Sequence, residues 1–335
     1  MSSEPISIIR LAERITTEAE AYKLLEDMRW GEDRSGQSCP KCGSVRKFYF
    51  IAPKDGGETR KTNRGTATQR RRWKCADCRH QFSVLTGTIF HGTKISVRKW
   101  LFVIFEMCAS KNGISAREIE RKYELTAKSA WFMTHRIREA MKREPMAGLL
   151  ANTTVVADET FIGGLPKNKH QQGRKRPGTS KGYAGTPHHK TAVLSLVDKT
   201  TGEVRSRVVP NVTGDTLRDA IAEQVDTPSS HLHTDGHAGY RQIGHEFVSH
   251  EHVAHDRHEY VRGDVSTNQA ENFFSQLKRS IDGTHHHVSP EHLPRYLAEF
   301  DYRYSTRDMT DTERMRRVID QTQGRRLSWK PLRRD

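Results

Sequence analysis

Three acidic residues, Asp158, Asp235 and Glu271, lie in segments that could bring them to one site. Asp158 ends a β-branched run at residues 153–157, and Asp235 ends a short run that Gly236 interrupts. Carboxylates that lie close together repel each other unless cations neutralise them, and hard divalent cations prefer carboxylate oxygen. Two such ions would clamp the attacking and leaving oxygens of an in-line phosphoryl transfer. These residues therefore predict a site for two Mg²⁺ ions.

Glu271 falls in a segment with the period of an amphipathic helix, and Lys278 follows it by two turns. Ser266 and Gln269 have the spacing of a capping box at the start of this helix. At 100° per residue, Glu271 and Lys278 share one face, beside an apolar stripe. We expect the helix to pack through this stripe and to present a carboxylate and a lysine together. The stripe consists of Phe273, Phe274, Leu277 and Ile281.

Four cysteines come in two C-x-x-C pairs, Cys39 with Cys42 and Cys75 with Cys78. Each pair can present two thiolates, and two pairs make a tetrahedral zinc site. Disulfides are disfavoured in a reducing cytosol, and no βαβ pattern supports a redox pair. The 32 residues between the pairs are rich in Lys and Arg and predict an extended basic hairpin. The fifth cysteine, Cys108, lies in an apolar run and is interpreted as a core residue.

Residues 94–142 are predicted to form three helices, the last two with helix-turn-helix spacing. Ser115 and Glu118 have the spacing of a capping box at the start of the second. The third, at residues 127–141, carries basic side chains and could lie in a DNA major groove. A plain three-helix packing unit fits the same pattern, but the basic side chains and the adjacent cysteine pairs favour DNA. The contacts expected on this helix are Lys128, Arg136 and Arg138.

The chain has 56 Lys and Arg against 41 Asp and Glu, a formal net charge of +15. Clustered cations gain affinity by releasing counterions from nucleic acid, so this charge favours a polyanionic partner. Residues 163–190 hold seven Lys or Arg and no acid, close behind Asp158. A solvated insertion would have the same composition, but the place beside Asp158 favours DNA contacts. The contacts expected in this loop are Lys169, Arg174 and Lys175.

Eight histidines lie between residues 231 and 258. We interpret most of them as part of a polar surface, because no spacing among them repeats as a set of metal ligands should. His237 is the exception. It lies two residues after Asp235 and is a candidate phosphate contact.

Several of these features resemble insertion-sequence transposases with an RNase H-like catalytic core. The family is named for two aspartates and a glutamate in its active site. Its pattern resembles the spacing here, with 35 residues between Asp235 and Glu271 and a lysine seven residues after that glutamate. So do the phrases N-x-x-E-x-F-F-S-x-L-K-R, G-T-x-H-H-V-S-P and Y-L-x-E-F-x-x-R-Y in the C-terminal half. The cysteine pairs look like the branch that adds a zinc ribbon. The resemblance covers residues 17–305.

The resemblance implies an α/β protein in which an RNase H-like core follows a zinc ribbon and a helix-turn-helix-like domain. It also implies metal-dependent cleavage and strand transfer of double-stranded DNA at terminal inverted repeats, by a homodimer or higher oligomer. The expected segments are an N-terminal helix (1–34), the zinc ribbon (35–92), the helical domain (93–147), the catalytic domain (151–310) and a basic tail that trails across DNA or solvent (311–335).

Two other functions fit parts of the sequence. A domesticated, non-catalytic DNA-binding regulator would keep the cysteines and helices but lose an acidic residue, whereas all three carboxylates are present. A stand-alone RNase H-like nuclease would leave the N-terminal domains without an obvious role. Within the site, Asn268 precedes Glu271 by one turn and is the reserve candidate for the third ligand. We choose Glu271 because a carboxylate binds a hard cation better than an amide does.

No apolar run approaches the length of a membrane span, and the N-terminus lacks the pattern of a signal peptide. We therefore expect a cytoplasmic protein with no membrane partner, associated with the nucleoid of a bacterium when it is bound to DNA.

Overall fold

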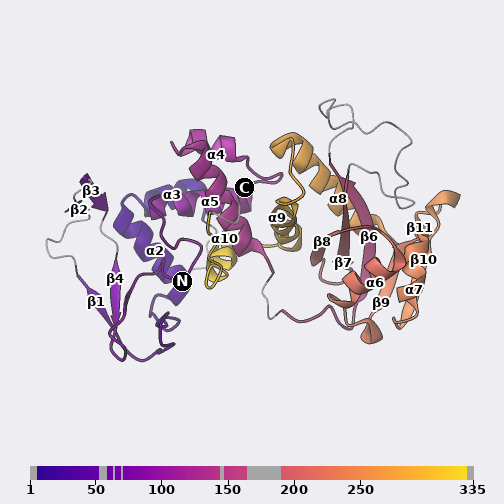
Figure 1. Ribbon diagram of the computed structural model, residues 1–335, viewed down its shortest axis with the longest axis horizontal. Coiled ribbons are helices and arrows are strands. Elements are labelled where there is room, and N and C mark those ends of the chain that lie inside the picture. Colours follow the sequence, from indigo (N-terminus) through magenta and orange to yellow (C-terminus); the bar gives the residue numbers. More distant parts are fainter. Residues whose placement is uncertain are drawn as a thin grey trace. The chain divides into compact units, whose positions relative to one another are not determined.

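The computed structural model describes residues 6–52, 59–62, 65–68, 71–143, 147–163 and 190–329 (Figure 1). The chain divides into two compact units. Unit 1 comprises Met1–Met141 together with Met309–Asp335, and unit 2 comprises Lys142–Asp308.

Unit 1 begins with helices α1 (Ile8–Arg14) and α2 (Glu18–Trp30). A three-stranded antiparallel sheet follows, in the order β1 (Phe48–Ile51), β4 (Arg72–Cys75), β5 (Gln81–Phe82). Between β1 and β4 the chain forms the hairpin β2–β3 (Thr59–Thr62 and Gly65–Thr68), which confirms the predicted basic hairpin.

Side chains of α2 join it to this small sheet. The Trp30 ring meets Trp73 and Phe82 edge to face, at 6.2 Å between centroids in both cases. Glu26 is fully buried and accepts hydrogen bonds from Trp73 Nε1 and Arg71 Nε, each at 3.0 Å. The buried carboxylate is therefore paired with charged and polar donors, as a buried charge requires.

The three helices predicted for the next segment are confirmed as α3 (Val97–Ala109), α4 (Ala116–Lys122) and α5 (Ala127–Met141). The Ser115 side chain accepts a hydrogen bond from the Glu118 backbone N–H at the start of α4, as its spacing predicts. Cys108 is buried on α3, in agreement with its interpretation as a core residue.

The expected basic tail is wrong for its first ten residues, because Asp311–Asp320 form helix α10 in unit 1. A capping box joins Thr310 and Glu313, and the helix contacts α2, α3 and α5. Met315, Val318 and Ile319 are buried at helical spacing. Burial of this stripe outweighs the high charge of the segment, which had suggested a solvated tail.

Unit 2 is built on a five-stranded sheet in the order β10-β9-β6-β7-β8. β6, β7 and β8 are antiparallel neighbours, whereas β9 runs parallel to β6 and β10 parallel to β9. Three antiparallel strands followed by two parallel strands on the far side of the first are the RNase H-like arrangement that was expected. The strands are β6 (Thr154–Ile162), β7 (Thr191–Asp198), β8 (Val204–Val209), β9 (His231–Asp235) and β10 (Ser249–Val253).

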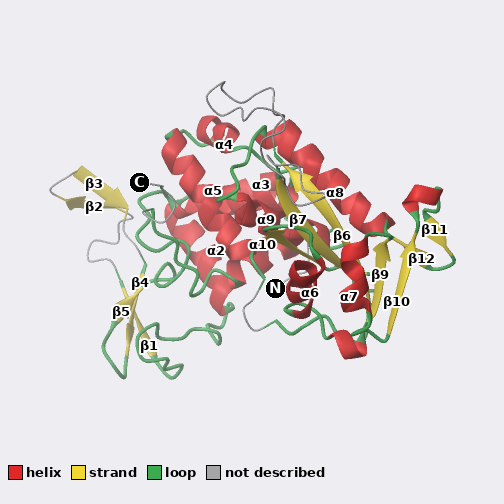
Figure 2. Ribbon diagram, turned by 45° about the vertical axis from the view of Figure 1, so that its right-hand side comes forward, coloured by secondary structure: helices red, strands yellow, loops and turns green. Residues whose placement is uncertain are grey.

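Helices lie along this sheet (Figures 1 and 2), and two hydrophobic clusters cover its two faces. On one face, Val155 and Ala157 of β6 pack with helices α6 (Gly214–Ala222) and α7 (Arg241–Gly244). On the other, Val156 and Ile162 of β6 pack with α8 (Asn268–Ser280) and α9 (Leu293–Ser305). Successive residues of a strand point to opposite faces, so odd positions of β6 face α6 and even positions face α8.

Short elements complete unit 2. A 3₁₀ turn, η4 (Ala238–Tyr240), links β9 to α7, and the hairpin β11–β12 (Val261–Arg262 and Val265–Ser266) precedes α8. Two further 3₁₀ turns are η3 (Thr227–Ser229) and η5 (His255–Arg257), and a π-helical turn, η6 (Ile281–His285), continues α8. None of the helices in the described parts of the chain is long and apolar enough to cross a membrane.

Candidate active site

Asp158 lies within β6 rather than at its end, because β6 continues to Ile162 in a ladder with β7. The ladder between β6 and β9 pairs Val156 with His233. Continued by two residues, this register sets Asp158 level with Asp235, the last residue of β9. Asp158 shares the parity of Val156, so both aspartates belong to the face that α8 covers.

Glu271 lies on that covering helix. α8 contacts β6 and β7, and its predicted stripe, Phe273, Phe274, Leu277 and Ile281, is buried as expected. Glu271 itself is 47% exposed, and Lys278 is also exposed, two turns further along.

The predicted capping box of α8 is wrong. Ser266 ends β12, and the N-cap residue is Thr267. The Thr267 hydroxyl donates to Glu271 Oε1 at 3.2 Å instead of bonding to the helix backbone, and His255 Nε2 lies 3.7 Å from the same oxygen. These neighbours hold the Glu271 carboxylate at the start of α8. Asn268, the reserve candidate, is the exposed first residue of the helix.

The carboxylates share one electrostatic environment. Burial, followed by the charges of Glu159, Asp235 and Glu271, raises the pKa of Asp158 to about 8, while a hydrogen bond from the Glu159 backbone N–H acts in the opposite direction. A carboxyl surrounded by like charges stays ionised only when a cation compensates them. The oxygen donors present here fit Mg²⁺, which prefers carboxylates. Asp158, Asp235 and Glu271 could therefore hold such ions.

The three carboxylates are not drawn tightly together. In the described parts of the chain, the four cysteines are the only group of three or more His, Cys, Asp or Glu side chains placed closely enough to hold one metal ion, and their sulfur atoms all lie within 4.8 Å of one another. Mutual repulsion and the contacts of Glu271 with Thr267 and His255 account for the looser arrangement of the acids.

The cysteines form the predicted zinc site. Cys39 Sγ lies 3.6 Å from Cys78 Sγ, and Cys42 Sγ lies 3.8 Å from Cys75 Sγ. A tetrahedron with Zn–S bonds of about 2.3 Å has edges of about 3.8 Å, so the spacing fits a structural Zn²⁺. None of the four is engaged in a disulfide.

Two of the DNA contacts expected on α5 are wrong. Arg136 and Arg138 are 5% and 1% exposed. Arg136 donates to the His91 carbonyl at 2.8 Å, and Arg138 donates to Thr134 Oγ1 at 3.1 Å. Both guanidinium groups thus belong to the interior of unit 1, because their stems lie on the face of α5 that packs inward. Lys128 is exposed, with its Nζ 4.6 Å from the centre of the Trp329 ring.

The remaining expected contacts, Lys169, Arg174 and Lys175, lie outside the described residues. His237 is 35% exposed and donates its backbone N–H to Asp235 Oδ1 at 3.0 Å. This bond orients the aspartate side chain, while the candidate role of His237 towards phosphate stays a prediction.

Two neighbours of the site, Glu159 and His255, were not predicted from the sequence. Glu159 follows Asp158 directly, and an acid that breaks into a β-branched run was an available signal. His255 was grouped with seven other histidines, and nothing in its spacing separates it from them. Its contact with Glu271 depends on the fold of the segment before α8.

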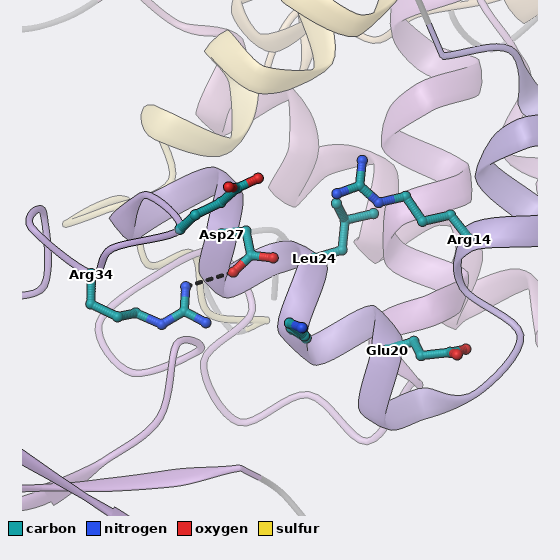
Figure 3. A pocket seen from close by; sticks show the side chains of 7 residues that line it. Arg14, Glu20, Leu24, Asp27 and Arg34 are labelled. Carbon is teal, nitrogen blue, oxygen red and sulfur yellow. Dashed lines mark hydrogen bonds and ion pairs between the residues drawn. The ribbon is translucent and has the colours of Figure 1, made fainter. Parts of the chain in front are cut away.

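A pocket of about 500 Å³ in unit 1 lies beside α2 (Figure 3). Its charged lining is mixed, and Asp27 pairs with Arg34 at 2.7 Å. Equal numbers of acidic and basic side chains favour neither an anionic nor a cationic ligand, so no site is assigned there. The lining residues are Arg14, Glu20, Lys23, Leu24, Asp27, Glu32 and Arg34.

Comparisons with known proteins agree with this arrangement. Residues 149–305 match the ISXO2-like transposase domain, and residues 16–81 match the transposase zinc-ribbon domain. The chain is 25% identical over 310 residues to an uncharacterized protein in transposable element ISH50 of Halobacterium salinarum, covering 91% of this chain and 96% of that protein.

Two solved structures are similar to the chain at low identity. The catalytic core domain of BIV integrase has 14% identity and a TM-score of 0.30, over 44% of this chain and 81% of the other. A simian T-cell lymphotropic virus intasome in complex with PP2A regulatory subunit B56 gamma has 15% identity and a TM-score of 0.27, over 56% of this chain and 63% of the other.

Proposed function

Because the chain belongs to the insertion-sequence transposases that join a zinc-ribbon domain to a DDE catalytic domain, we propose that it binds the inverted-repeat ends of a mobile element and catalyses their cleavage and transfer. The observation that supports this proposal is the placement of Asp158 level with Asp235 on the face of the sheet that is covered by α8, the helix that carries Glu271. Burial and the neighbouring carboxylates raise the pKa of Asp158 to about 8, and a bound cation would favour its ionised form.

In this mechanism Asp158, Asp235 and Glu271 would hold two Mg²⁺ ions. The ions supply charge stabilisation to the attacking and leaving oxygens of the scissile phosphate. In the first step, a water oxygen bonds to the phosphorus as the bond to the DNA 3′-oxygen breaks, and that oxygen leaves as a 3′-hydroxyl. In the second, the oxygen of this hydroxyl bonds to a target phosphorus and loses its proton as the bond to another 3′-oxygen breaks, and that oxygen takes up a proton and leaves as a 3′-hydroxyl. No Ser or Tyr nucleophile is required.

The exposed Lys278 would steady the DNA near the scissile phosphate from the same helix as Glu271. End recognition is assigned to the zinc ribbon and to the exposed part of α5 around Lys128, while the 163–190 loop would add phosphate contacts that do not depend on sequence. The division into these domains, and a dimeric or larger assembly on DNA, belong to the same proposal.

The test is a reaction of the purified full chain with a labelled element end and a target plasmid. We expect a nick with a free 3′-hydroxyl and a joined product in Mg²⁺, and neither in EDTA. Binding of the end without either product in Mg²⁺ would instead favour a non-catalytic regulator. Cleavage of RNA–DNA hybrids in preference to element ends would favour a stand-alone nuclease.

A further inference from the structure

Glu159 is a buried acid directly beside the proposed catalytic residues, and no step of the mechanism uses it. It follows Asp158 on β6, so strand alternation sends its side chain to the opposite, α6-facing side of the sheet. The side chain is only 10% exposed. Burial of a carboxylate costs free energy unless polar groups form hydrogen bonds with it. The polar groups around Glu159 therefore indicate its role.

Both oxygens of Glu159 face the turn that follows Asp235. The fully buried Tyr240 donates its hydroxyl to Oε2, and His237 Nδ1 lies 3.6 Å from Oε1. The same turn supplies the His237 backbone N–H that bonds to Asp235 Oδ1. One carboxylate on β6 is therefore tied to the turn that orients a carboxylate on β9.

The Glu159–Tyr240 hydrogen bond lies beyond the end of the backbone ladder between β6 and β9. The hydrogen-bonded pairs between β6 and β9 run from Thr154–His231 to Val156–His233 and stop two residues short of Asp158 and Asp235. Beyond that point, backbone pairing does not fix the separation of the two aspartates. The Glu159–Tyr240 hydrogen bond is the next link between the same two segments.

We propose that Glu159 is a positioning residue, which binds the turn at residues 237–240 to β6 and thereby sets the distance between Asp158 and Asp235. It touches neither substrate nor metal, because it lies on the other face of the sheet. The inference rests on the proposed function in that the pair it positions is the Mg²⁺-binding pair. Partners that orient metal ligands in this way contribute strongly to metal affinity.

The rival explanation is that Glu159 only stabilises the core around Tyr240. The two explanations differ in what the hydrogen bond controls: a core residue affects the stability of unit 2, whereas a positioning residue affects Mg²⁺ affinity in protein that is still folded. Mg²⁺ affinity of the DNA-free full chain, measured by titration calorimetry, separates them without relying on catalysis.

Three variants test the Glu159–Tyr240 hydrogen bond. Glu159→Ala removes it, Tyr240→Phe removes only the hydroxyl and keeps the buried ring, and Glu159→Gln keeps an acceptor for the hydroxyl. We expect Glu159→Ala and Tyr240→Phe each to weaken Mg²⁺ binding by about 10- to 100-fold. Glu159→Gln, which keeps the hydrogen bond and removes only the charge, should weaken Mg²⁺ binding less than Glu159→Ala does. The double variant Glu159→Ala/Tyr240→Phe should be no worse than the weaker single, because both remove the same interaction.

Asp301→Asn is the matched control, a change of another buried acid in unit 2 that bonds to β8 instead of the turn after β9. It should leave Mg²⁺ affinity unchanged. If Glu159→Ala and Tyr240→Phe bind Mg²⁺ as wild type does and lose only thermal stability, the positioning role is wrong and the transposase proposal stands. If wild type binds Mg²⁺ but cuts no element end, the transposase proposal fails, and weakened Mg²⁺ binding by Glu159→Ala and Tyr240→Phe would still support the positioning role. Wild type that binds no Mg²⁺ overturns both.

Discussion

The two most perturbed acids among those described here, Asp158 and Asp301, differ in what surrounds them. Burial is the largest cause of the raised pKa at both, but three other carboxylates add to it at Asp158, whereas only Glu203 does so at Asp301. Desolvation and like charges both favour the protonated acid, but only like charges mark a place for a cation. Asp158 is therefore assigned to the proposed metal site, and Asp301 is assigned to the core of unit 2.

Asp301 gives a prediction about pH. Burial raises its pKa to about 7, and the Ser206 backbone N–H bonds to Oδ2 at 2.7 Å. Between about pH 4 and 7 the folded chain holds a proton that the unfolded chain has lost, so the stability that this proton contributes is complete at low pH and disappears as pH rises through about 7.

Asp301→Asn should remove that dependence. We expect the melting temperature of unit 2, measured without Mg²⁺ from pH 5 to pH 8, to fall less steeply in the variant than in wild type. Parallel curves for the two proteins would show that Asp301 does not titrate as described.

At the scale of elements, the pattern of apolar residues predicted most of what was later observed. α5 begins and ends at its expected residues, 127 and 141, because the segment has a clear helical period. β6 was cut short at Asp158, since an Asp-Glu pair is rare in strands, although Thr160 and Ile162 continue the β-branched pattern.

Side-chain direction was harder to predict than the elements themselves. Arg136 and Arg138 were assigned to DNA from their charge, but burial depends on what packs against α5, and α10 from the far end of the chain contributes to that packing. Single-helix periodicity does not reveal a partner so distant in sequence. The capping box at Thr310 and Glu313 and the stripe of α10 were present in the sequence, and the net charge of the segment hid them.

The burial of Arg138 predicts a loss of stability without a change in DNA preference. Arg138→Ala removes a buried guanidinium and its bond to Thr134, and it should destabilise unit 1 by about 2 kcal/mol. Lys128→Ala, an exposed change on the same helix, should leave stability unchanged and weaken binding to element ends.

Thermal unfolding and binding to matched and scrambled ends measure both effects. If the Arg138→Ala protein melts like wild type but no longer discriminates between matched and scrambled ends, Arg138 contacts DNA and does not stabilise unit 1.

At the scale of the whole molecule, different interactions stabilise the fold of each unit. Unit 2 has a two-sided hydrophobic core around its sheet, whereas the ribbon of unit 1 has short strands and four cysteines with the spacing of a zinc site. Structural zinc contributes directly to the folding free energy of so small a module.

Removal of this zinc should therefore unfold only part of the chain. In Cys75→Ser, hydrogen exchange should become fast in residues 39–82 and in α2, which Trp30 and Glu26 attach to the sheet. Exchange in β6, β7 and β9 should stay slow. Cys108→Ser is the control, since that cysteine is buried outside the zinc site. Wild-type protection of the ribbon in metal-free Cys75→Ser would contradict a structural role for zinc.

The measurement that tests the central claim most directly is cleavage of a labelled element end by variants of the proposed ligands, with binding of the same end measured in parallel. Asp158→Ala, Asp235→Ala and Glu271→Ala should each abolish cleavage in Mg²⁺ and leave end binding largely intact, because the proposal assigns recognition to unit 1 and the loss of an acid near a phosphate relieves repulsion. Lys278→Ala should slow cleavage without ending it, and Asn268→Ala should retain it. Full cleavage by Glu271→Ala together with loss in Asn268→Ala, or undiminished wild-type cleavage in EDTA, would contradict this account.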